Sequence, residues 1–397
     1  MTTAAMSMTE PRTAPGLERV TVGLLLCFVA SLQISIAAAN ILLAMLLPCW
    51  IALAVRDKTF RSIPRFCWPL LAYGAVTLAV SAVSVDPRAS LIDDKQLVLF
   101  AIVPAVYHIA RGDRASLVVD VLVSVGAASA AMGIIQYGLL HYDNLGRRPE
   151  GAMSHYMTYS GLLMLVICAA AARLIFGRHG RIWPALVMPA LVVALALTLG
   201  RSAWVGAAAA VAILLALRDF RLTAILPMLI ALAFAVSPGT VTSRARSIFD
   251  VQDPTNQDRL AMVEIGARIV RDHPLAGVGP NMIPRVYGDY RPDYAVNTVN
   301  PHLHNVPLQI AAERGVPALL VWGWFIGGLA LAHLRLFRSR TDKVPAAAGI
   351  AAVAAMLAAG LFEYNFGDSE FLMLFLVLVT LPFAAARGDD AAAATHV

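Results

Sequence analysis

Residues 183–217 read WPALVMPALVVALALTLGRSAWVGAAAAVAILLAL, and Arg201 is their only charged residue. Two apolar runs, 183–199 and 202–217, flank this arginine. Each is close to the roughly 18 residues that a helix needs to cross about 30 Å of hydrocarbon. Soluble cores are not built from runs of this length, so the stretch predicts two membrane helices joined by almost no loop.

The same pattern extends over the whole chain of 397 residues, which is 59% hydrophobic and only 14% charged. A soluble domain of this size carries roughly 25% charged residues. We therefore expect one all-α, polytopic membrane domain over residues 1–397 with about twelve transmembrane helices. The ten further apolar runs are 18–35, 37–55, 67–84, 97–110, 116–139, 158–176, 222–237, 315–336, 346–362 and 370–386.

The positions of Lys and Arg predict the orientation. With the N-terminus inside, eighteen of the 31 fall in inside segments, five in short outside loops and eight in segment 238–314. Because positive residues resist translocation, both termini are expected on the cytoplasmic side. Segment 238–314, between helices 9 and 10, then becomes one large, partly helical loop on the non-cytoplasmic side of the inner membrane. The net charge of +6 gives no sign of a nucleic-acid partner, because its meaning lies in where the charges fall.

In this orientation Arg201 lies at the non-cytoplasmic surface of the bilayer. A guanidinium there can bind a phosphate through two hydrogen bonds. It can also be an interfacial anchor whose charge reaches water. Arg147 and Arg148, which follow helix 5 on the same side, are weaker candidates for anion binding.

Segment 238–314 carries eight arginines and eight acidic residues, so anion recognition there must come from a few placed arginines. Residues 257–272 have helical spacing, with an apolar face of Leu260, Val263, Ala267 and Val270. Arg259 lies near the start of this helix, where it is either a ligand-binding group or a plain solvated arginine.

Histidines and carboxylates complete the candidate site. His304, and less strongly His302, stand just before helix 10, and imidazole groups accept protons near neutral pH. His302 is otherwise a surface or capping residue. No HExxH or CxxC spacing is present, so no metal is expected. Asp368 lies in the last outside loop, where it is either a further site residue or a hydrated helix end.

Three motifs together resemble the O-antigen ligase family, which also includes O-antigen polymerases. His304-Asn305, nine residues and Gly315-Val-Pro317 resemble the family signature. Residues 201–206 resemble its middle-helix arginine, and Arg259 followed by residues 273–280 resembles the start of its large periplasmic loop. The likeness covers roughly residues 60–385.

This resemblance implies an inverting, metal-independent glycosyltransferase without a cofactor. The donor would be O-antigen on undecaprenyl diphosphate in the membrane, and the acceptor a sugar hydroxyl of lipid A-core. His304 would act as general base, and Arg201 with Arg259 would hold the diphosphate at a site facing the periplasm.

Three other functions stay open at this point. An O-antigen polymerase or a protein-glycosylating ligase of the same superfamily would share these motifs. A multi-helix transporter fits the helix count, although transporters place ionisable residues near the middle of the bilayer.

Overall fold

The computed structural model describes residues 15–59 and 63–395, which form helices and the loops between them, with no β-strand. Arg12 and Arg61, which contributed to the predicted orientation, lie outside these residues. The helices are α1 (Pro15–Ser31), α2 (Ile36–Arg56), α3 (Cys67–Ser81), α4 (Pro87–Asp93), η1 (Asp94–Ala101), α5 (Ile102–Ile109), α6 (Asp113–Gly138), α7 (Tyr156–Phe176), α8 (Ile182–Leu197), α9 (Arg201–Arg218), η2 (Phe220–Ile225), α10 (Leu226–Ala235), α11 (Gly239–Arg246), η3 (Ser247–Phe249), α12 (Pro254–Asp272), α13 (Ile283–Tyr290), α14 (Val306–Ser339), α15 (Val344–Gly360), η4 (Asn365–Gly367) and α16 (Ser369–Thr395).

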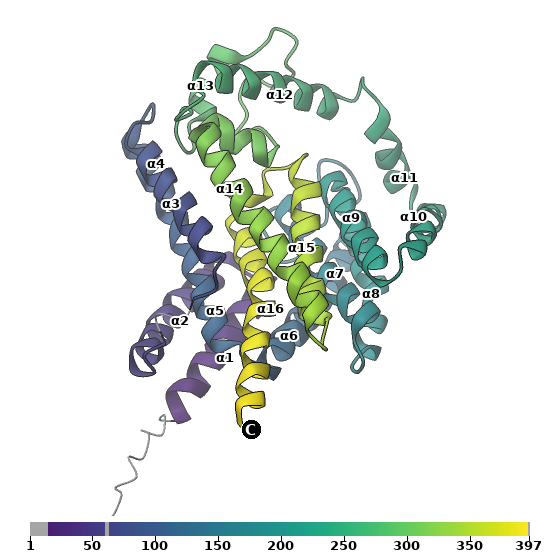
Figure 1. Ribbon diagram of the computed structural model, residues 1–397. Coiled ribbons are helices and arrows are strands. Elements are labelled where there is room, and N and C mark those ends of the chain that lie inside the picture. The colour runs from purple at the N-terminus through teal and green to yellow at the C-terminus, as the bar shows by residue number, and fades with distance from the viewer. Residues whose placement is uncertain (1–14, 60–62, 396–397) are drawn as a thin grey trace, which may run out of the picture.

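Each of the twelve predicted apolar runs overlaps a helix. Among the described residues, however, only six helices are long and apolar enough to cross a membrane: α2, α6, α7, α9, α14 and α16. The chain is thus a multi-pass membrane protein, whereas the number of twelve spans stays a prediction. The described chain begins and ends at one end of the bundle, and segment 239–305 lies at the other (Figure 1). This arrangement fits the predicted orientation without testing it.

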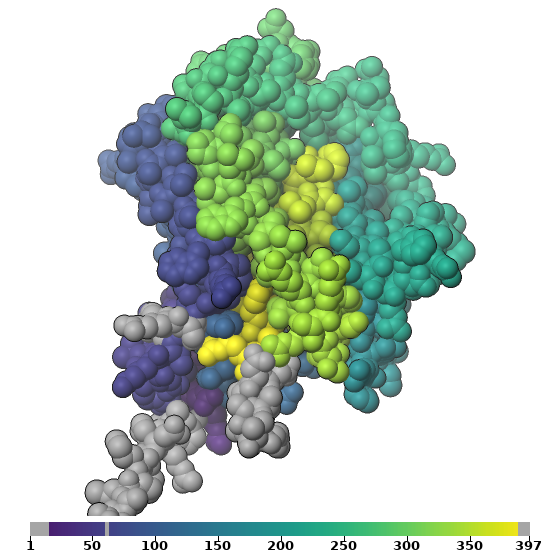
Figure 2. All heavy atoms as spheres, viewed as in Figure 1, coloured from purple at the N-terminus to yellow at the C-terminus, as the bar shows by residue number. Residues whose placement is uncertain are grey.

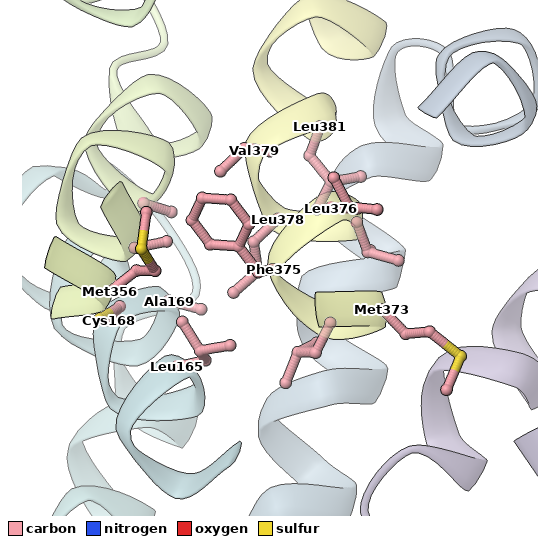
Figure 3. Close-up of a cluster of buried hydrophobic side chains, with 14 of the residues drawn as sticks. Leu165, Cys168, Ala169, Met356, Met373, Phe375, Leu376, Leu378, Val379 and Leu381 are labelled. Carbon is pink, nitrogen blue, oxygen red and sulfur yellow. The ribbon is translucent and has the colours of Figure 1, made fainter. Parts of the chain in front are cut away.

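The centre of the bundle is formed by α7 and α16, which are the most buried of the six long helices. Leu165 on α7, Met356 on α15 and Phe375 on α16 are fully buried in one cluster (Figure 3). Helix α9 packs closely beside them. A Cβ atom at Gly206 would lie 2.8 Å from the carbonyl oxygen of Ala355. The glycine therefore lets the first turns of α9 approach α15.

Helix α14 is broken at Gly315, whose φ of 79° and ψ of 168° are not helical. The break frees backbone groups that water cannot satisfy in a buried position. The turn after α12 supplies their partners. Val278 donates its N–H to the carbonyl of Ala312 at 2.9 Å, and Gly279 donates to that of Glu313 at 2.8 Å. Two of the motifs found in the sequence therefore interlock through their backbones.

Replacing Gly315 with alanine is expected to destabilise the protein by about 1–3 kcal/mol, because its backbone conformation is essentially open to glycine alone. The added Cβ would also meet the backbone of Leu275. Thermal unfolding in lipid nanodiscs measures the effect. Gly323→Ala on the same helix is the matched control, since its Cβ meets nothing within 4 Å. Equal midpoints for the two variants would contradict this role of Gly315.

Residues 239–305, here called the cap, lie over one end of the bundle (Figure 2). The cap has a small core, in which Met262, Ile265 and Ile269 of α12 meet Tyr287 of α13 and Leu303. Ala312 of α14 belongs to the same cluster, so this packing also attaches the cap to the bundle.

The apolar face predicted for residues 257–272 is mostly exposed in α12. Leu260 is 57% exposed and Val263 48% exposed, while Met262 and Ile265 on the neighbouring face are buried. Both faces of α12 carry apolar residues, so periodicity alone did not show which one packs.

Candidate functional site

The segment that carries His304 is fixed by the start of α14. Asn305 is the N-cap residue, and its side-chain oxygen accepts a hydrogen bond from the N–H of Leu308 at 2.9 Å. Its amide group also donates to the carbonyl of Leu361 at 3.0 Å. A single side chain thereby caps the helix and ties residue 304 to the loop between α15 and α16.

His304 is paired with Glu363 across this junction. The Nδ1 atom of His304 lies 2.9 Å and 3.0 Å from the two carboxylate oxygens. Burial would raise the pKa of Glu363, but His304, His302 and Arg259 outweigh burial and lower this pKa to about 2. An ionised carboxylate only accepts hydrogen bonds, so Nδ1 carries the hydrogen and Nε2 is left as the basic nitrogen. His304 also has a positive φ of 50°, a conformation that its surroundings must impose.

His302 stands beside this pair, with its ring centre 4.1 Å from that of His304. Its Nε2 atom lies 3.8 Å from Glu363, too far for a direct hydrogen bond. Burial, and then the neighbouring His304, lower the pKa of His302 to about 4, so its ring is neutral at neutral pH. Ligand atoms of His302, His304 and Glu363 lie within 4.8 Å of one another. This trio could hold a metal ion, a possibility that the sequence motifs did not indicate.

Arg201 is the first residue of α9 and is only 7% exposed. One guanidinium nitrogen donates to the carbonyl and hydroxyl oxygens of Ser247, both at 3.0 Å. Another lies 3.5 Å from Asp253, which also pairs with Arg244 at 3.4 Å. Arg201 therefore joins the bundle to the cap instead of extending into water. Sequence reasoning missed Arg244 and Asp253, since no motif marks them.

Arg259 projects from α12 and makes no hydrogen bond to the described residues. Burial lowers the pKa of Arg259, and its charge acts on Glu363 and His302. A guanidinium remains protonated at neutral pH even so. Arg259 thus brings a partly buried positive charge close to His302 and His304, here called the histidine pair.

Arg201, Arg259 and His304 line one cavity of about 320 Å³, here called the apolar cavity. Several of its side chains are strongly exposed, including Phe249 at 89%. Leu260 and Val263, the exposed face of α12, form part of its wall. The apolar lining consists of Val205, Ile248, Phe249, Val251, Leu260, Val263, Leu303, Leu361 and Phe362.

A second cavity, also of about 320 Å³ and here called the polar cavity, lies on the other side of the histidine pair. Ser202 lines both cavities, so they adjoin at the start of α9. Hydroxyl and amide groups are frequent in its lining. Its carboxyl groups are Asp93, Glu313, Glu363 and Asp368.

The weaker candidates are distributed differently. His302 and Asp368 line the polar cavity, whereas Arg147 and Arg148 line neither cavity. Arg147 stacks on Tyr142, and Arg148 stacks on Tyr156. Burial and Glu370 raise the pKa of Asp368 to about 6.

Comparison with known proteins identified one matching family model. Residues 185–323 match the family model described as O-antigen ligase. The matched range includes Arg201, Arg259 and His304 but ends before Glu363. No curated protein matches the chain.

Proposed function

We propose that this chain, whose residues 185–323 match the O-antigen ligase family model, is a member of that family and transfers a glycan from a polyprenyl diphosphate to a sugar hydroxyl. The family includes ligases and polymerases. We assign the ligase reaction, in which the donor is O-antigen on undecaprenyl diphosphate and the acceptor is lipid A-core. In this proposal the reaction takes place at the periplasmic face of the bacterial inner membrane.

The observation that carries this proposal is the composition of the apolar cavity. It combines two guanidinium groups and a carboxylate-backed imidazole with a lining of exposed apolar side chains. A diphosphate with a hydrocarbon tail presents the complementary combination of charge and apolar surface. The volume of about 320 Å³ also falls in the range of small-molecule sites.

In the donor half of the reaction, the bond between the anomeric carbon and the diphosphate oxygen breaks. The leaving diphosphate takes the electron pair, and negative charge grows on its oxygens. Arg201 and Arg259 stabilise this charge from fixed positions, Arg201 because Ser247 and Asp253 already hold it. The fixed donor also allows the acceptor to approach the carbon in line.

In the acceptor half, the sugar hydroxyl attacks the anomeric carbon and loses its proton to Nε2 of His304. Glu363 holds Nδ1–H and stabilises the imidazolium that forms. His304 then releases the proton to solvent or to the departing diphosphate. A single direct attack of this kind inverts the configuration of the anomeric carbon.

The proposal is tested in a bacterial strain that lacks its own O-antigen ligase. Expression of this chain should restore the ladder of long lipopolysaccharide on a gel. A polymerase would instead be recognised in a strain that adds only one repeat to the core, where it would restore long chains. Bare core in the first strain together with restored chains in the second would replace the ligase assignment with the polymerase.

Treatment of the purified protein with EDTA is expected to leave the transfer rate unchanged, because the two arginines supply the positive charge at the donor. The measurement uses an assay without added divalent ions, and a metal-dependent glycosyltransferase serves as the control for chelation. A loss of activity that zinc restores would show instead that His302, His304 and Glu363 hold a required ion.

A further inference from the structure

The polar cavity is not needed to bind a diphosphate, and its lining differs sharply from that of the apolar cavity. His304 faces the apolar cavity, while Glu363 and His302 line the polar cavity behind it. The histidine pair therefore forms a partition between two spaces of similar volume. Ser202 lines both cavities, so the two spaces are neighbours at the start of α9.

The charge of the polar cavity argues against a phosphate. None of its lining residues in the described part of the chain is Lys or Arg. Glu313 is already satisfied, because Arg314 and the N–H of Asn281 donate to it at 2.7 Å and 2.9 Å. The other carboxyl groups are Asp93, Glu363, which His304 holds, and Asp368, which accepts a hydrogen bond from Thr158. Their negative charge would repel an anion. The apolar cavity, by contrast, presents Arg201 and Arg259 against one carboxyl group, Asp250.

Unused hydrogen-bonding groups in the polar cavity favour a ligand rich in hydroxyl groups. The side-chain oxygen of Asn365 is buried without a partner among the described residues, although its amide donates to the carbonyl of Met356 at 3.3 Å. The Nδ1 atom of His302 is likewise buried without a partner among them. Buried polar atoms of this kind are costly unless a ligand or water satisfies them.

From this difference in charge, and resting on the proposed function, we propose that the polar cavity binds the acceptor sugar. The cavity selects a sugar that carries no phosphate on the part that enters it. Asp93 and Gln96 are specificity-determining residues. Asp93 accepts hydrogen bonds from the hydroxyl groups of the sugar, and the amide of Gln96 donates to them. The two substrates are thereby separated by charge. The anionic donor lies with the arginines, and the uncharged acceptor lies with the carboxyl groups.

The proposal predicts that substitutions in the polar cavity change the KM of the acceptor without changing the KM of the donor. In purified protein in nanodiscs, with a polyprenyl-diphosphate oligosaccharide and a lipid-anchored oligosaccharide acceptor, Asp93→Asn and Gln96→Ala should each raise the acceptor KM about tenfold. The donor KM should stay within twofold of wild type. Leu260→Ala in the apolar cavity is the matched control, and it should raise the donor KM alone.

A second measurement compares two acceptors on the wild-type protein. An acceptor phosphorylated next to the accepting hydroxyl should be used at least tenfold less well than the unphosphorylated form. Asp93→Asn should narrow this difference, which a merely structural role would not do. Thermal midpoints of the variants identify any that fail to fold.

The outcomes separate this inference from the function on which it rests. A folded wild-type protein that transfers no glycan would overturn the proposed function. Normal transfer with an unchanged acceptor KM in both polar-cavity variants would overturn only the acceptor site. Equal use of the phosphorylated and unphosphorylated acceptors would also overturn it.

Discussion

Replacing His304 with alanine is expected to lower the rate of glycan transfer about 10²–10⁴-fold, because a positioned general base contributes a factor of this size. Glu363 holds Nδ1 of His304 at 2.9 Å, which leaves Nε2 to accept the hydroxyl proton in the proposed reaction. The effect should lie in kcat, with the donor KM little changed. Single-turnover transfer in nanodiscs measures it.

His273→Ala is the matched control, because His273 is an exposed cap residue that lines neither cavity. Glu363→Gln should lose less activity than His304→Ala, since the amide can still accept the Nδ1 hydrogen bond but has no charge. Wild-type transfer by the His304→Ala protein would remove His304 from the mechanism. A loss in the His273→Ala protein would show that the assay responds to damage in the cap instead.

Arg259→Ala is expected to reduce transfer about 10²–10³-fold, the range found when one preorganised electrostatic group is removed. Arg259 makes no hydrogen bond to the described residues, so its removal should cost little stability. Arg259→Lys should recover only part of the rate, because an ammonium group does not offer the paired hydrogen bonds of a guanidinium. Rates and donor KM values in nanodiscs are the measurements.

Arg271→Ala on the same helix is the control, since its side chain is 76% exposed. Arg201→Ala should differ from Arg259→Ala by also lowering the thermal midpoint, because Arg201 joins α9 to Ser247 and Asp253. An Arg259→Ala protein with full activity would exclude Arg259 from donor binding. An unchanged thermal midpoint in the Arg201→Ala protein would contradict the role of Arg201 in holding the cap on α9.

The sequence predicts helices well and their pairings poorly. Apolar runs locate the helices because length and hydropathy are local properties. The number of membrane spans is harder to predict, because a run such as 97–110 forms two short helices, η1 and α5, instead of one long helix. The two apolar faces of α12 show the same limit. Periodicity cannot tell a face that packs in the cap from one that lines a cavity.

For the site, three residues chosen from the sequence, Arg201, Arg259 and His304, lie around one cavity. Their catalytic roles remain proposals. Glu363 was visible only as one carboxylate of the last outside loop, because its contact with His304 spans 59 residues of sequence. The pairing of Asp253 with Arg201 and Arg244 depends on how the cap folds over α9, which no local pattern records.

Phe249, Val251 and Leu361 form an exposed apolar rim of the apolar cavity. For a donor that enters through this rim, the concentration that matters is the one in the membrane. A tail that enters through this rim never leaves the bilayer, so encounters occur by diffusion in two dimensions. The rate should then follow the mole fraction of donor among the lipids. Adding inert phospholipid would slow the enzyme, whereas diluting the same vesicles with buffer would not.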